Sequence, residues 1–503
     1  MIRILSVENM RKSDAYTIEN FTSGKELMMR AGKGVFAESE KRIGWKAPVA
    51  IVCGSGNNGG DGYVIAGLLH DEGIDCTLFL LSNKFSEDGK YYYDQAVQKG
   101  IQTVFLEEAV DIDFSGFNTI ADCILGTGSF GELRGLAKAV VEKINESEAA
   151  VVGVDMNTGL GGNNGIGTTC VKSDLTVAIG DFKPGHFLNM AKDQIKEKVS
   201  CDIGIEPIDR PYFLIEEDDI KGLFRKRKNF ANKGDYGYIA LVGGSVPYSG
   251  AIRLADMANT AMCTGAGVVK LAVPESICAV TMPHILESTL YPLAEKDGYI
   301  LFDSAQIDGL IKNVKTVAFG MGIGNTEETQ KTLEYILEKY EGILVVDADG
   351  LNALAKVDQD TRKAFVGKLV VTPHLKEFSG LTKKTIDEIL QNPIVYAEEY
   401  AKEENCIVLL KGPTTIITDG ETTYLTDRGC GGMATAGSGD VLSGIMAAVC
   451  GYSGNENLLL AVVAAAYING AAGEKAQEHF GSISMTAKDT ASFIKEVVME
   501  LEE

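Results

Sequence analysis

The sequence predicts an α/β protein with two domains, each a doubly wound parallel sheet covered by helices on both faces. Three observations support this class. Apolar runs alternate with helical patterns in two separate series, a charged segment with two prolines divides the series, and glycine-rich loops follow several of the apolar runs. Because parallel strands need long crossover connections, such alternation is typical of a helix-flanked, three-layer sheet.

The composition is that of a globular protein. Of the 503 residues, 45% are hydrophobic and 23% are charged, which excludes a disordered chain. The formal charge of −23 opposes broad affinity for nucleic acid or for an anionic membrane, so we expect neither partner. The basic run at 225–228 is interpreted as a solvated linker.

Cysteine usage and the apolar segments bear on the compartment. The ten cysteines form no CxxC pair and lie in apolar segments, as reduced core thiols do. The chain opens without the pattern of a secretory signal, so we expect a cytoplasmic protein. The apolar stretch 458–473 is shorter than the roughly 20 residues of a membrane span, which predicts a buried helix.

The first series predicts a Rossmann-like, three-layer domain over residues 1–210. Two amphipathic helical patterns between Ser6 and Ile43 precede its sheet, and we expect them to pack across it. A helical pattern at 61–73 and an acidic helical stretch fall between the first strands. The predicted parallel strands lie in 48–54, 75–81, 118–125, 149–155 and 174–180.

The second series predicts another, mostly parallel domain over residues 211–503. The pattern breaks between about Glu206 and Lys233, which we interpret as the domain junction. A long helical tail ends the chain, and no internal repeat or low-complexity tract is present. The predicted strands lie in 236–244, 267–273, 314–320, 342–349, 368–373 and 406–412.

Three loops at successive strand ends of the first domain indicate a ligand site. The glycine-rich loop 54–62 opens a helix, where backbone N–H groups can bind a phosphate. Its spacing is not GxGxxG, and its Asn and Asp oxygens also suit a hard cation. Asp122 and Asp155 follow two further strands, and such loops converge on one crevice. Each Asp alone could be a helix cap or a turn former; three loops together favour the ligand site.

These loops resemble the GxGNNGGDG, AD…GTG…G and VDxxSG loops of the NAD(P)H-hydrate epimerase family, across about the first 205 residues. The resemblance implies a potassium ion held by Asn58, Asp122 and Thr158. It also implies that Asp155 is the acid/base that interconverts the two C6 epimers of the hydrate. The implied ligands of the hydrated dinucleotide are Asn57, Asn58, Gly59, Gly60, Asp61, Gly126, Thr127, Gly128, Ser129, Phe130, Gly131, Glu132 and Asp155.

One loop departs from the family pattern. Where the family has VDIPSG, residues 154–159 read Val-Asp-Met-Asn-Thr-Gly. Thr158 keeps a hydroxyl at the position of the usual serine, whereas the loss of proline is expected to loosen the turn and to change the path of the loop. Because Asp155 is retained, we favour an active epimerase over a domain that only binds.

The second domain contains a possible phosphoryl-transfer site. Residues Ala436–Asp440 precede an apolar helix, and their small side chains would expose backbone N–H groups at the positive helix end beside one carboxylate. Alone, the stretch could be a glycine-rich helix entry capped by Asp. Lys411–Thr415 and His374 follow two other strands and favour the functional interpretation. His374 could otherwise be a buried histidine at a strand end.

These residues and the sequence segments around them resemble the ribokinase-like NAD(P)H-hydrate dehydratase family over about residues 215–500. VDADGLNAL and TPHLKEF separate this branch from other ribokinase-superfamily enzymes, and Gly350 stands where alanine is usual. The resemblance implies that Asp440 deprotonates the C6 hydroxyl of the S-hydrate, that the nucleotide's terminal phosphate is transferred to it, and that phosphate is then eliminated.

The same resemblance implies two sets of ligands in this domain. ADP or ATP with Mg²⁺ would be bound by Lys411, Gly412, Pro413, Thr414, Thr415 and Gly439. The hydrate of NADH or NADPH would be bound by Ala251, Gly322, Gly324, His374 and Asp440. We favour ADP as the donor, as in bacterial-type fused members, and we expect a homo-oligomer.

Two other functions fit parts of the sequence. A small-molecule kinase of the ribokinase superfamily would explain the second domain but not the loops of the first. A dinucleotide-sensing scaffold would explain binding loops in the first domain, but Asp155 and Asp440 are both present. The loops, rather than the fold alone, therefore favour a bifunctional repair enzyme.

Overall fold

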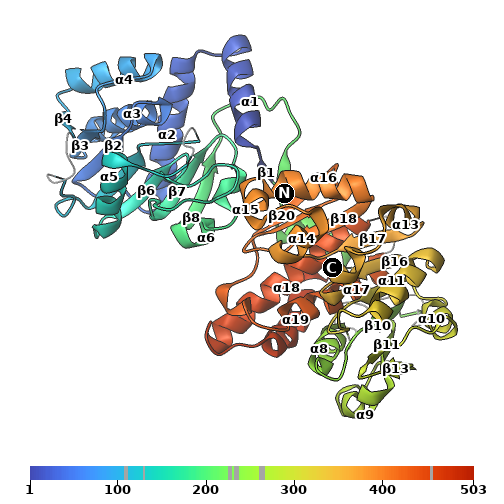
Figure 1. Ribbon diagram of the computed structural model, residues 1–503. Helices are drawn as coiled ribbons and strands as arrows, with labels where there is room; N and C mark the ends of the chain where they lie inside the picture. The colour runs from blue at the N-terminus through green and yellow to red at the C-terminus, as the bar shows by residue number, and fades with distance from the viewer. Residues whose placement is uncertain are drawn as a thin grey trace. The chain divides into compact units, whose positions relative to one another are not determined.

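The computed structural model divides into two compact units, Arg3–Tyr212 and Phe213–Glu503 together with Met1–Ile2, and each is described by itself (Figure 1). The structure describes residues 1–106, 112–127, 131–224, 229–230, 237–259, 267–453 and 457–502. The basic run predicted to be a linker, 225–228, lies outside these residues.

The first unit contains a seven-stranded sheet of order β4-β3-β2-β5-β6-β7-β8, in which every neighbouring pair is parallel. From β2 the chain adds strands first on one side and then on the other, which confirms the doubly wound class. The strands are β2 (Val49–Cys53), β3 (Cys76–Leu80), β4 (Gln102–Phe105), β5 (Thr119–Cys123), β6 (Ala150–Val154), β7 (Ser173–Ile179) and β8 (Ile195–Cys201).

Helices cover both faces of this sheet. Val49 and Ile51 of β2 share a core with α2 and α3, whereas Ala50 and Val52 share another with α5. This alternation is what a strand buried on both faces requires. The helices are α1 (Val7–Asn20), α2 (Gly24–Arg42), α3 (Asn57–Asp71), α4 (Glu87–Gln98), α5 (Gly135–Glu146) and α6 (Ala191–Gln194).

The two predicted N-terminal helices are confirmed as α1 and α2, and both pack on the sheet. The side chain of Ser6 accepts a hydrogen bond from the Asn9 amide, and that of Ser23 accepts one from the Glu26 amide, so each helix begins with a serine cap. Met10 of α1 and Leu27 of α2 are buried in the same core as the odd-numbered residues of β2.

The second unit contains a sheet of order β12-β11-β10-β15-β16-β17-β18-β19-β20-β9, with β1 (Ile2–Ile4) at the edge beyond β9. Its pairs are parallel except β18 with β19 and β19 with β20. Its strands are β9 (Tyr212–Leu214), β10 (Tyr238–Val242), β11 (Val268–Pro274), β12 (Thr289–Leu293), β15 (Thr316–Phe319), β16 (Ile343–Val346), β17 (Lys368–Val371), β18 (Cys406–Leu410), β19 (Thr415–Thr418) and β20 (Thr423–Thr426); β13 (Glu295–Lys296) and β14 (Tyr299–Ile300) form a separate hairpin.

Part of the segment interpreted as a junction is regular structure. Within 206–233, β9 pairs with β20, and α7 (Glu217–Ile220) follows it. Three residues of β9 are too few to produce a detectable periodicity, and an acidic cluster follows them directly. Because this stretch is mostly polar, its sequence did not indicate that β9 belongs to the second sheet.

Helices also cover both faces of the second sheet. Ile239 and Leu241 of β10 share one core with α8 (Ser249–Asn259) and the C-terminal helices, while Ala240 and Val242 are buried on the opposite face. The remaining helices are α9 (Cys278–Thr281), α10 (Ser304–Ile311), α11 (Glu327–Lys339), α12 (Asp349–Leu354), α13 (Gln359–Ala364), α14 (Leu375–Thr382), α15 (Ile386–Gln391), α16 (Pro393–Glu404), α17 (Ser438–Ser453), α18 (Leu458–Phe480) and α19 (Ala487–Leu501).

The predicted buried helix is α18. In the described part of the chain it is the one helix that has the length and composition of a membrane span, but 72% of its apolar window is buried within the protein. It is longer than the predicted stretch because the polar turns from Glu474 to Phe480 continue the helix. Its burial against α17 and α19 is that of a core helix.

Candidate functional site

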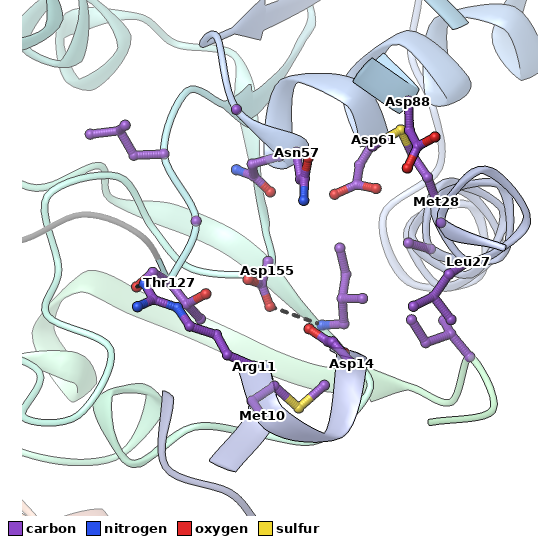
Figure 2. Close-up of a pocket in the computed structure, with 18 of the residues that line it drawn as sticks. Met10, Arg11, Asp14, Leu27, Met28, Asn57, Asp61, Asp88, Thr127 and Asp155 are labelled. Atoms are coloured by element: carbon purple, nitrogen blue, oxygen red, sulfur yellow. Dashed lines mark hydrogen bonds between the residues drawn. The ribbon is translucent and has the colours of Figure 1, made fainter. Parts of the chain in front are cut away.

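A cavity of about 490 Å³ lies in the first unit where loops after β2, β5, β6 and β7 meet α1 and α2. The strand order reverses between β2 and β5, so the cavity lies at the switch point of the sheet, where ligands of such folds bind. Figure 2 shows Asp14, Asp61 and Asp155 facing the same space from three different elements. The predicted convergence of the loops is therefore present.

Asp155 follows β6 and forms an ion pair with a lysine. The Lys183 ammonium donates a hydrogen bond of 2.5 Å to Asp155 Oδ1 and one of 2.9 Å to the Ile179 carbonyl. Lys183 is 1% exposed, so water screens this pair little. Burial alone would raise the pKa of Asp155, but the Lys183 charge and hydrogen bond lower it below its ordinary value. Asp155 is consequently ionised at neutral pH.

His186 fixes the backbone around this pair. Its Nδ1 accepts a hydrogen bond from the Lys183 amide at 2.9 Å, so Nε2 carries the proton and donates to the Asp155 carbonyl at 2.6 Å. Burial and the Lys183 charge lower the pKa of His186 to about 4, which keeps the ring neutral. Asp155 has a φ of +63°, an uncommon conformation for a residue other than glycine, and these contacts hold it there.

Three further carboxyl groups border the cavity: Asp14, Asp61 and, from α4, Asp88. Asp61 lies in the second turn of α3 and Asp14 in the middle of α1. Burial, followed by the charges of Asp155 and Asp14, raises the pKa of Asp61 well above its ordinary value. Burial likewise raises the pKa of Asp14 to about 6, although the Lys183 charge opposes this. The pKa of Asp61 is therefore raised beside the ionised Asp155, whereas Asp14 changes protonation near pH 6.

Asp122 and Thr158 are brought together at the ends of β5 and β6. The Thr158 amide donates to Asp122 Oδ2 at 2.8 Å, and its hydroxyl donates to Oδ1 at 2.7 Å. Asp122 is fully buried, and burial raises its pKa to about 6 although these hydrogen bonds and that of the Ile124 amide oppose the shift. Asn58 is also buried, and both polar atoms of its side chain lack a hydrogen-bond partner among the described residues.

The expectation that the 154–159 loop is loosened by the loss of proline is wrong. Asn157 is fully buried, and its amide nitrogen donates to the Val171 carbonyl and to Ser173 Oγ, both at 2.9 Å. Its amide oxygen accepts a hydrogen bond from the Thr176 hydroxyl. A side-chain network thus holds this turn, and it places Thr158 against Asp122.

The second site lies at the carboxyl ends of β16, β17 and β18. Lys411 Nζ donates to Asp347 Oδ1 at 2.8 Å, and Ser443 Oγ donates to Oδ2 at 2.6 Å. A Cβ at Gly439 would lie 3.5 Å from Lys411 Nζ and 3.6 Å from Asp347 Oδ2, which places this ion pair against the first turn of α17. A positive charge and a helix N-terminus therefore face the same space, as anion binding requires.

Asp440 is partly buried beside this ion pair. Burial and the nearby charge of Asp347 raise its pKa to about 7, while Lys411 opposes the increase. The pKa of Asp347 shifts in the opposite direction because of its hydrogen bonds. Lys411 bonds directly to Asp347, and its charge helps to lower that pKa against the effect of burial. Asp440 is thus the carboxyl group of this site that changes protonation near neutral pH.

His374 lies beside Lys411 and begins α14. The Lys411 amide donates to the Pro373 carbonyl at 2.8 Å, which holds the two loops together. His374 Nδ1 accepts a hydrogen bond from the Glu377 amide at 3.1 Å, and its side chain is 52% exposed. The alternative of a buried strand-end histidine is therefore wrong; the ring caps α14 and remains accessible.

A glycine-rich loop after β15 completes this side of the sheet. A Cβ at Gly322 would lie 2.8 Å from the Ala251 Cβ, so the loop approaches α8 closely. The Gly324 amide donates to Asp349 Oδ2 at 3.0 Å. The loop follows β15, which is next to β10, and this is where the strand order of the second sheet reverses.

Comparisons with known proteins agree with both halves of the chain. The family model described as NAD(P)H-hydrate dehydratase matches residues 239–496, and that described as YjeF-related protein N-terminus matches 24–185. A bifunctional NAD(P)H-hydrate repair enzyme of Thermofilum pendens is 31% identical, covering 100% of this chain and 97% of the relative. One of Archaeoglobus fulgidus is 34% identical, covering 94% of each.

The chain belongs to the family of bifunctional NAD(P)H-hydrate repair enzymes.

Solved structures agree with the fold of the second unit. An ADP/ATP-dependent NAD(P)H-hydrate dehydratase from Bacillus subtilis, crystallised with ATP and Mg²⁺, has a TM-score of 0.51 at 24% identity, covering 58% of this chain and 99% of that one. A ribokinase-like superfamily protein of Enterococcus faecalis has a TM-score of 0.50 at 17% identity, over 58% and 96%. The predicted ribokinase-like fold is confirmed.

Within this family member, some residues expected in the epimerase site border the cavity and others do not. Those that border it are Asn57, Asn58, Asp61, Gly126, Thr127 and Asp155. Gly59 and Gly60 are buried in the first turn of α3, and a Cβ at Gly59 would lie 2.2 Å from the Gly54 carbonyl oxygen. Gly131 and Glu132 are exposed, and Gly128, Ser129 and Phe130 lie outside the described residues.

The expected nucleotide ligands of the repair enzyme lie around the start of β19. Lys411 and Gly439 are close together, whereas Gly412 and Pro413 are exposed in the intervening turn. Thr414 is buried, and its hydroxyl donates to Asp427 Oδ1 at 2.8 Å. Thr415 begins β19.

Several residues of the two sites were not selected from the sequence. Lys183 and His186 follow β7, so the rule that selected Asp122 and Asp155 could have found them. Asp347 and Glu377 lie inside the quoted motifs VDADGLNAL and TPHLKEF and were not assigned a role there. Asp14 lies inside an amphipathic helix, where no local signal distinguishes a cavity-facing carboxyl from a solvated one.

Proposed function

We propose that this chain restores hydrated NADH and NADPH, with residues 1–210 interconverting the R- and S-hydrates and residues 211–503 converting the S-hydrate to NADH or NADPH with ADP or ATP. The observation that supports this function is the presence, in each unit of this family member, of a carboxyl group beside a lysine at the carboxyl ends of the strands.

In the epimerase unit, Asp155 is proposed to move the proton of the C6 hydroxyl. Its ionised state, held by Lys183, gives it the capacity to accept that proton. The hydrated dinucleotide would occupy the cavity bordered by Asn57, Thr127 and Asp155, with a phosphate near the start of α3.

A potassium ion is proposed at Asn58, Asp122 and Thr158, and two features of these residues fit it. Asp122 is fully buried and receives hydrogen bonds from neutral groups, with no cation paired to it in the described part of the chain. Asn58 has a buried amide oxygen without a partner. A hard cation accepts such oxygen ligands and would compensate the Asp122 charge. When bound, it would tie three loops together.

In the dehydratase unit, Asp440 is proposed to deprotonate the C6 hydroxyl of the S-hydrate. A pKa of about 7 suits a general base at neutral pH. The freed oxygen takes the terminal phosphoryl group of the nucleotide, and the phosphate then leaves with that oxygen as the dihydropyridine ring is restored. The Gly437–Gly439 amides and Lys411 would stabilise the charge on the transferring phosphoryl group.

The ligands proposed for this unit are those expected from the sequence. Lys411 to Thr415 and Gly439 would bind ADP or ATP, and Ala251, Gly322, Gly324 and His374 would contact the hydrate. Mg²⁺ with the nucleotide fits the carboxylate of Asp347, which borders the same space as Lys411. It would supply charge neutralisation of the phosphates.

Three further properties are proposed for the whole chain. We place it in the cytoplasm, without a nucleic-acid or membrane partner, in agreement with its formal charge of −23. We also propose a homo-oligomer. Val280, Met282 and Leu286 expose 52%, 59% and 90% of their surface within one short segment, and such apolar exposure suits an interface.

A restoration assay tests the proposed function. NADH hydrate, as separated R and S epimers, is mixed with the protein, Mg²⁺ and either ADP or ATP, and regenerated NADH is followed by its absorbance. We expect nucleotide-dependent restoration of the S-hydrate and restoration of the R-hydrate faster than its spontaneous epimerisation. Absence of restoration with both nucleotides would refute the dehydratase assignment.

A further inference from the structure

The charges around the epimerase cavity are compensated unevenly. Four carboxyl groups border it, Asp14 from α1, Asp61 from α3, Asp88 from α4 and Asp155 after β6 (Figure 2). The Lys183 ammonium bonds to Asp155 alone among them. Arg11 also borders the cavity, but its guanidinium donates to the Thr127 carbonyl at 3.2 Å. Lys183, the one buried cation among the described residues that line the cavity, therefore favours the ionised form of Asp155.

Asp61 has the opposite environment. It is 7% exposed, and no described residue donates a hydrogen bond to its carboxyl group or forms an ion pair with it. The charge of Asp155 acts on it across the cavity, and burial with this charge raises its pKa. A carboxyl group without a partner, close to an ionised one, retains its proton at neutral pH because a second buried negative charge is too costly.

Resting on the proposed epimerase function, we propose that Asp61 and Asp155 form an acid–base pair: Asp155, kept ionised by Lys183, accepts the C6 hydroxyl proton while Asp61 gives a proton to ring nitrogen N1. Two carboxyl groups whose surroundings separate their protonation states are suited to these two roles. Lys183 is a positioning residue, since it acts through Asp155.

The proton transfers balance over the reaction. In ring opening, Asp155 takes the hydroxyl proton, the C6–O bond becomes a carbonyl, and the C6–N1 bond breaks with its electron pair going to N1, which takes the proton of Asp61. Rotation about C5–C6 turns the other face of the carbonyl toward N1. In closure N1 attacks C6 and returns its proton to Asp61, and the oxygen regains its proton from Asp155. No other reactant is consumed.

Substitution of Asp61 by asparagine separates proton transfer from binding. The side-chain amide introduced by D61N can donate a hydrogen bond, as a neutral carboxyl group does, but it cannot release a proton. For D61N we expect kcat for R-to-S conversion to fall at least about 100-fold with KM within about threefold of wild type, in the range of general acid catalysis. A KM increase that accounts for the loss, or activity within about fivefold of wild type, would overturn the acid role.

The pH dependence tests Lys183. The charged and titratable groups facing the pair are Asp14 and Arg11 from α1, Asp88 from α4, and Lys183 and His186 after β7. Since Lys183 lowers the pKa of Asp155, K183M should move the acid limb of kcat/KM to higher pH by at least about one unit, with activity recovering above it, and K183R should restore the wild-type limb. A uniform loss at every pH would mean a structural role and overturn the assignment.

A further variant keeps the test decisive if K183M does not fold. D14N removes a negative charge that faces Asp61, so the basic limb, which reports the acid, should move to lower pH. If D14N leaves the basic limb unchanged, Asp61 is not the group whose loss of a proton produces that limb. Dehydration of the S-hydrate by the same preparations, together with the fluorescence of Trp45 in the first unit, reports folding.

The rate of R-to-S conversion by the unaltered protein distinguishes failure of the proposed epimerase function from failure of the acid–base pair. If the unaltered protein does not accelerate R-to-S conversion, the proposed epimerase function fails before any variant is compared. If it does accelerate the conversion and D61N or K183M gives the contrary outcome above, the function stands and the acid–base pair fails.

Discussion

Asp155 and Asp440 are each close to a lysine, but the two lysines have different effects. Lys183 bonds to Asp155 itself, whereas Lys411 bonds to Asp347 and affects Asp440 only through space. Asp155 is therefore ionised throughout the neutral range, and Asp440 changes protonation near pH 7. The same residue types produce two kinds of base because a hydrogen bond stabilises the ionised form of one and burial disfavours that of the other.

The dehydratase should lose activity as pH falls through the pKa of Asp440. That pKa is raised to about 7, and the base must be deprotonated, so kcat/KM for the S-hydrate should be maximal above pH 7 and fall about tenfold per pH unit below it. D440N should abolish dehydration and leave R-to-S conversion unchanged. Rates with S-hydrate and saturating ADP across the pH range check both statements; substantial dehydration by D440N would remove Asp440 from the mechanism.

Asp155→Asn should affect only the R-hydrate. The variant removes the proton acceptor of the first unit and leaves Lys183 in place, so restoration of the R-hydrate should slow to the rate of spontaneous epimerisation. Restoration of the S-hydrate should be unaltered, because its machinery lies in the other unit. The assay is NADH absorbance with each separated epimer. R-hydrate restored by D155N at the wild-type rate would contradict the role of Asp155.

Asn157 should be important for stability. Its truncation to alanine leaves the Ser173 and Thr176 hydroxyls and the Val171 carbonyl without this partner in the core, and we expect a loss of about 1 to 3 kcal/mol in the free energy of unfolding. Trp45, the only tryptophan, is buried in the first unit and reports its denaturant unfolding. The exposed Asn20 provides the control N20A, expected within about 0.5 kcal/mol of wild type. Equal effects of both variants would contradict the role of the network.

At the scale of elements, burial decided what the sequence could predict. β2, β16 and β18 are continuous apolar runs because they are buried on both faces, and all were predicted. β4 and β8 lie at the two edges of their sheet; β4 has no buried residue and β8 is buried only at its two ends, so both lacked that signal. Because these strands could be recognised, the polar residues at their carboxyl ends could be selected as candidate site residues.

Other parts of the candidate site depended on tertiary structure. Asp14 reaches the cavity only because α1 packs across the sheet, and no spacing along the chain encodes that contact. The turn around Asn157 was expected to be loose because the amide's partners lie on β7 and in the segment before it, far from Asn157 in sequence. Motifs thus located the site, whereas packing determined its protonation states and the conformation of its loops.

The three loops after β2, β5 and β6 should respond to potassium as a unit. Asn58 lies in the first turn of α3, Asp122 near the end of β5 and Thr158 after β6, so one ion would join three segments, and replacing sodium with potassium at constant ionic strength should raise epimerase activity. Constant ionic strength matters because screening alone changes how a phosphate-bearing ligand meets a chain of charge −23. Asp122→Ala should weaken the response more than Thr158→Ala, because it removes the only charged ligand of the three. Equal rates in both salts would refute the shared-ion site.

At the scale of the whole molecule, each unit has its own sheet, core and site. The residues proposed for epimerisation all lie within Arg3–Tyr212, and those proposed for dehydration all lie within Phe213–Glu503. The S-hydrate formed in the first unit can therefore reach the second through solvent, because the chemistry requires no shared residue.

Two inactive variants should accordingly complement each other. D440N retains the epimerase site and D155N retains the dehydratase site, so an equimolar mixture supplied with R-hydrate, Mg²⁺ and ADP should restore NADH several-fold faster than D155N alone, while D440N alone should restore none. Lowering the concentration of D440N in the mixture should reduce the rate, since that variant would be the source of S-hydrate. The matched control replaces D440N with the double variant D155N/D440N, which should bring no gain. If the mixture is no faster than D155N alone although both variants retain their single activities, then S-hydrate does not pass between molecules through solvent, and the two sites of one chain must act together.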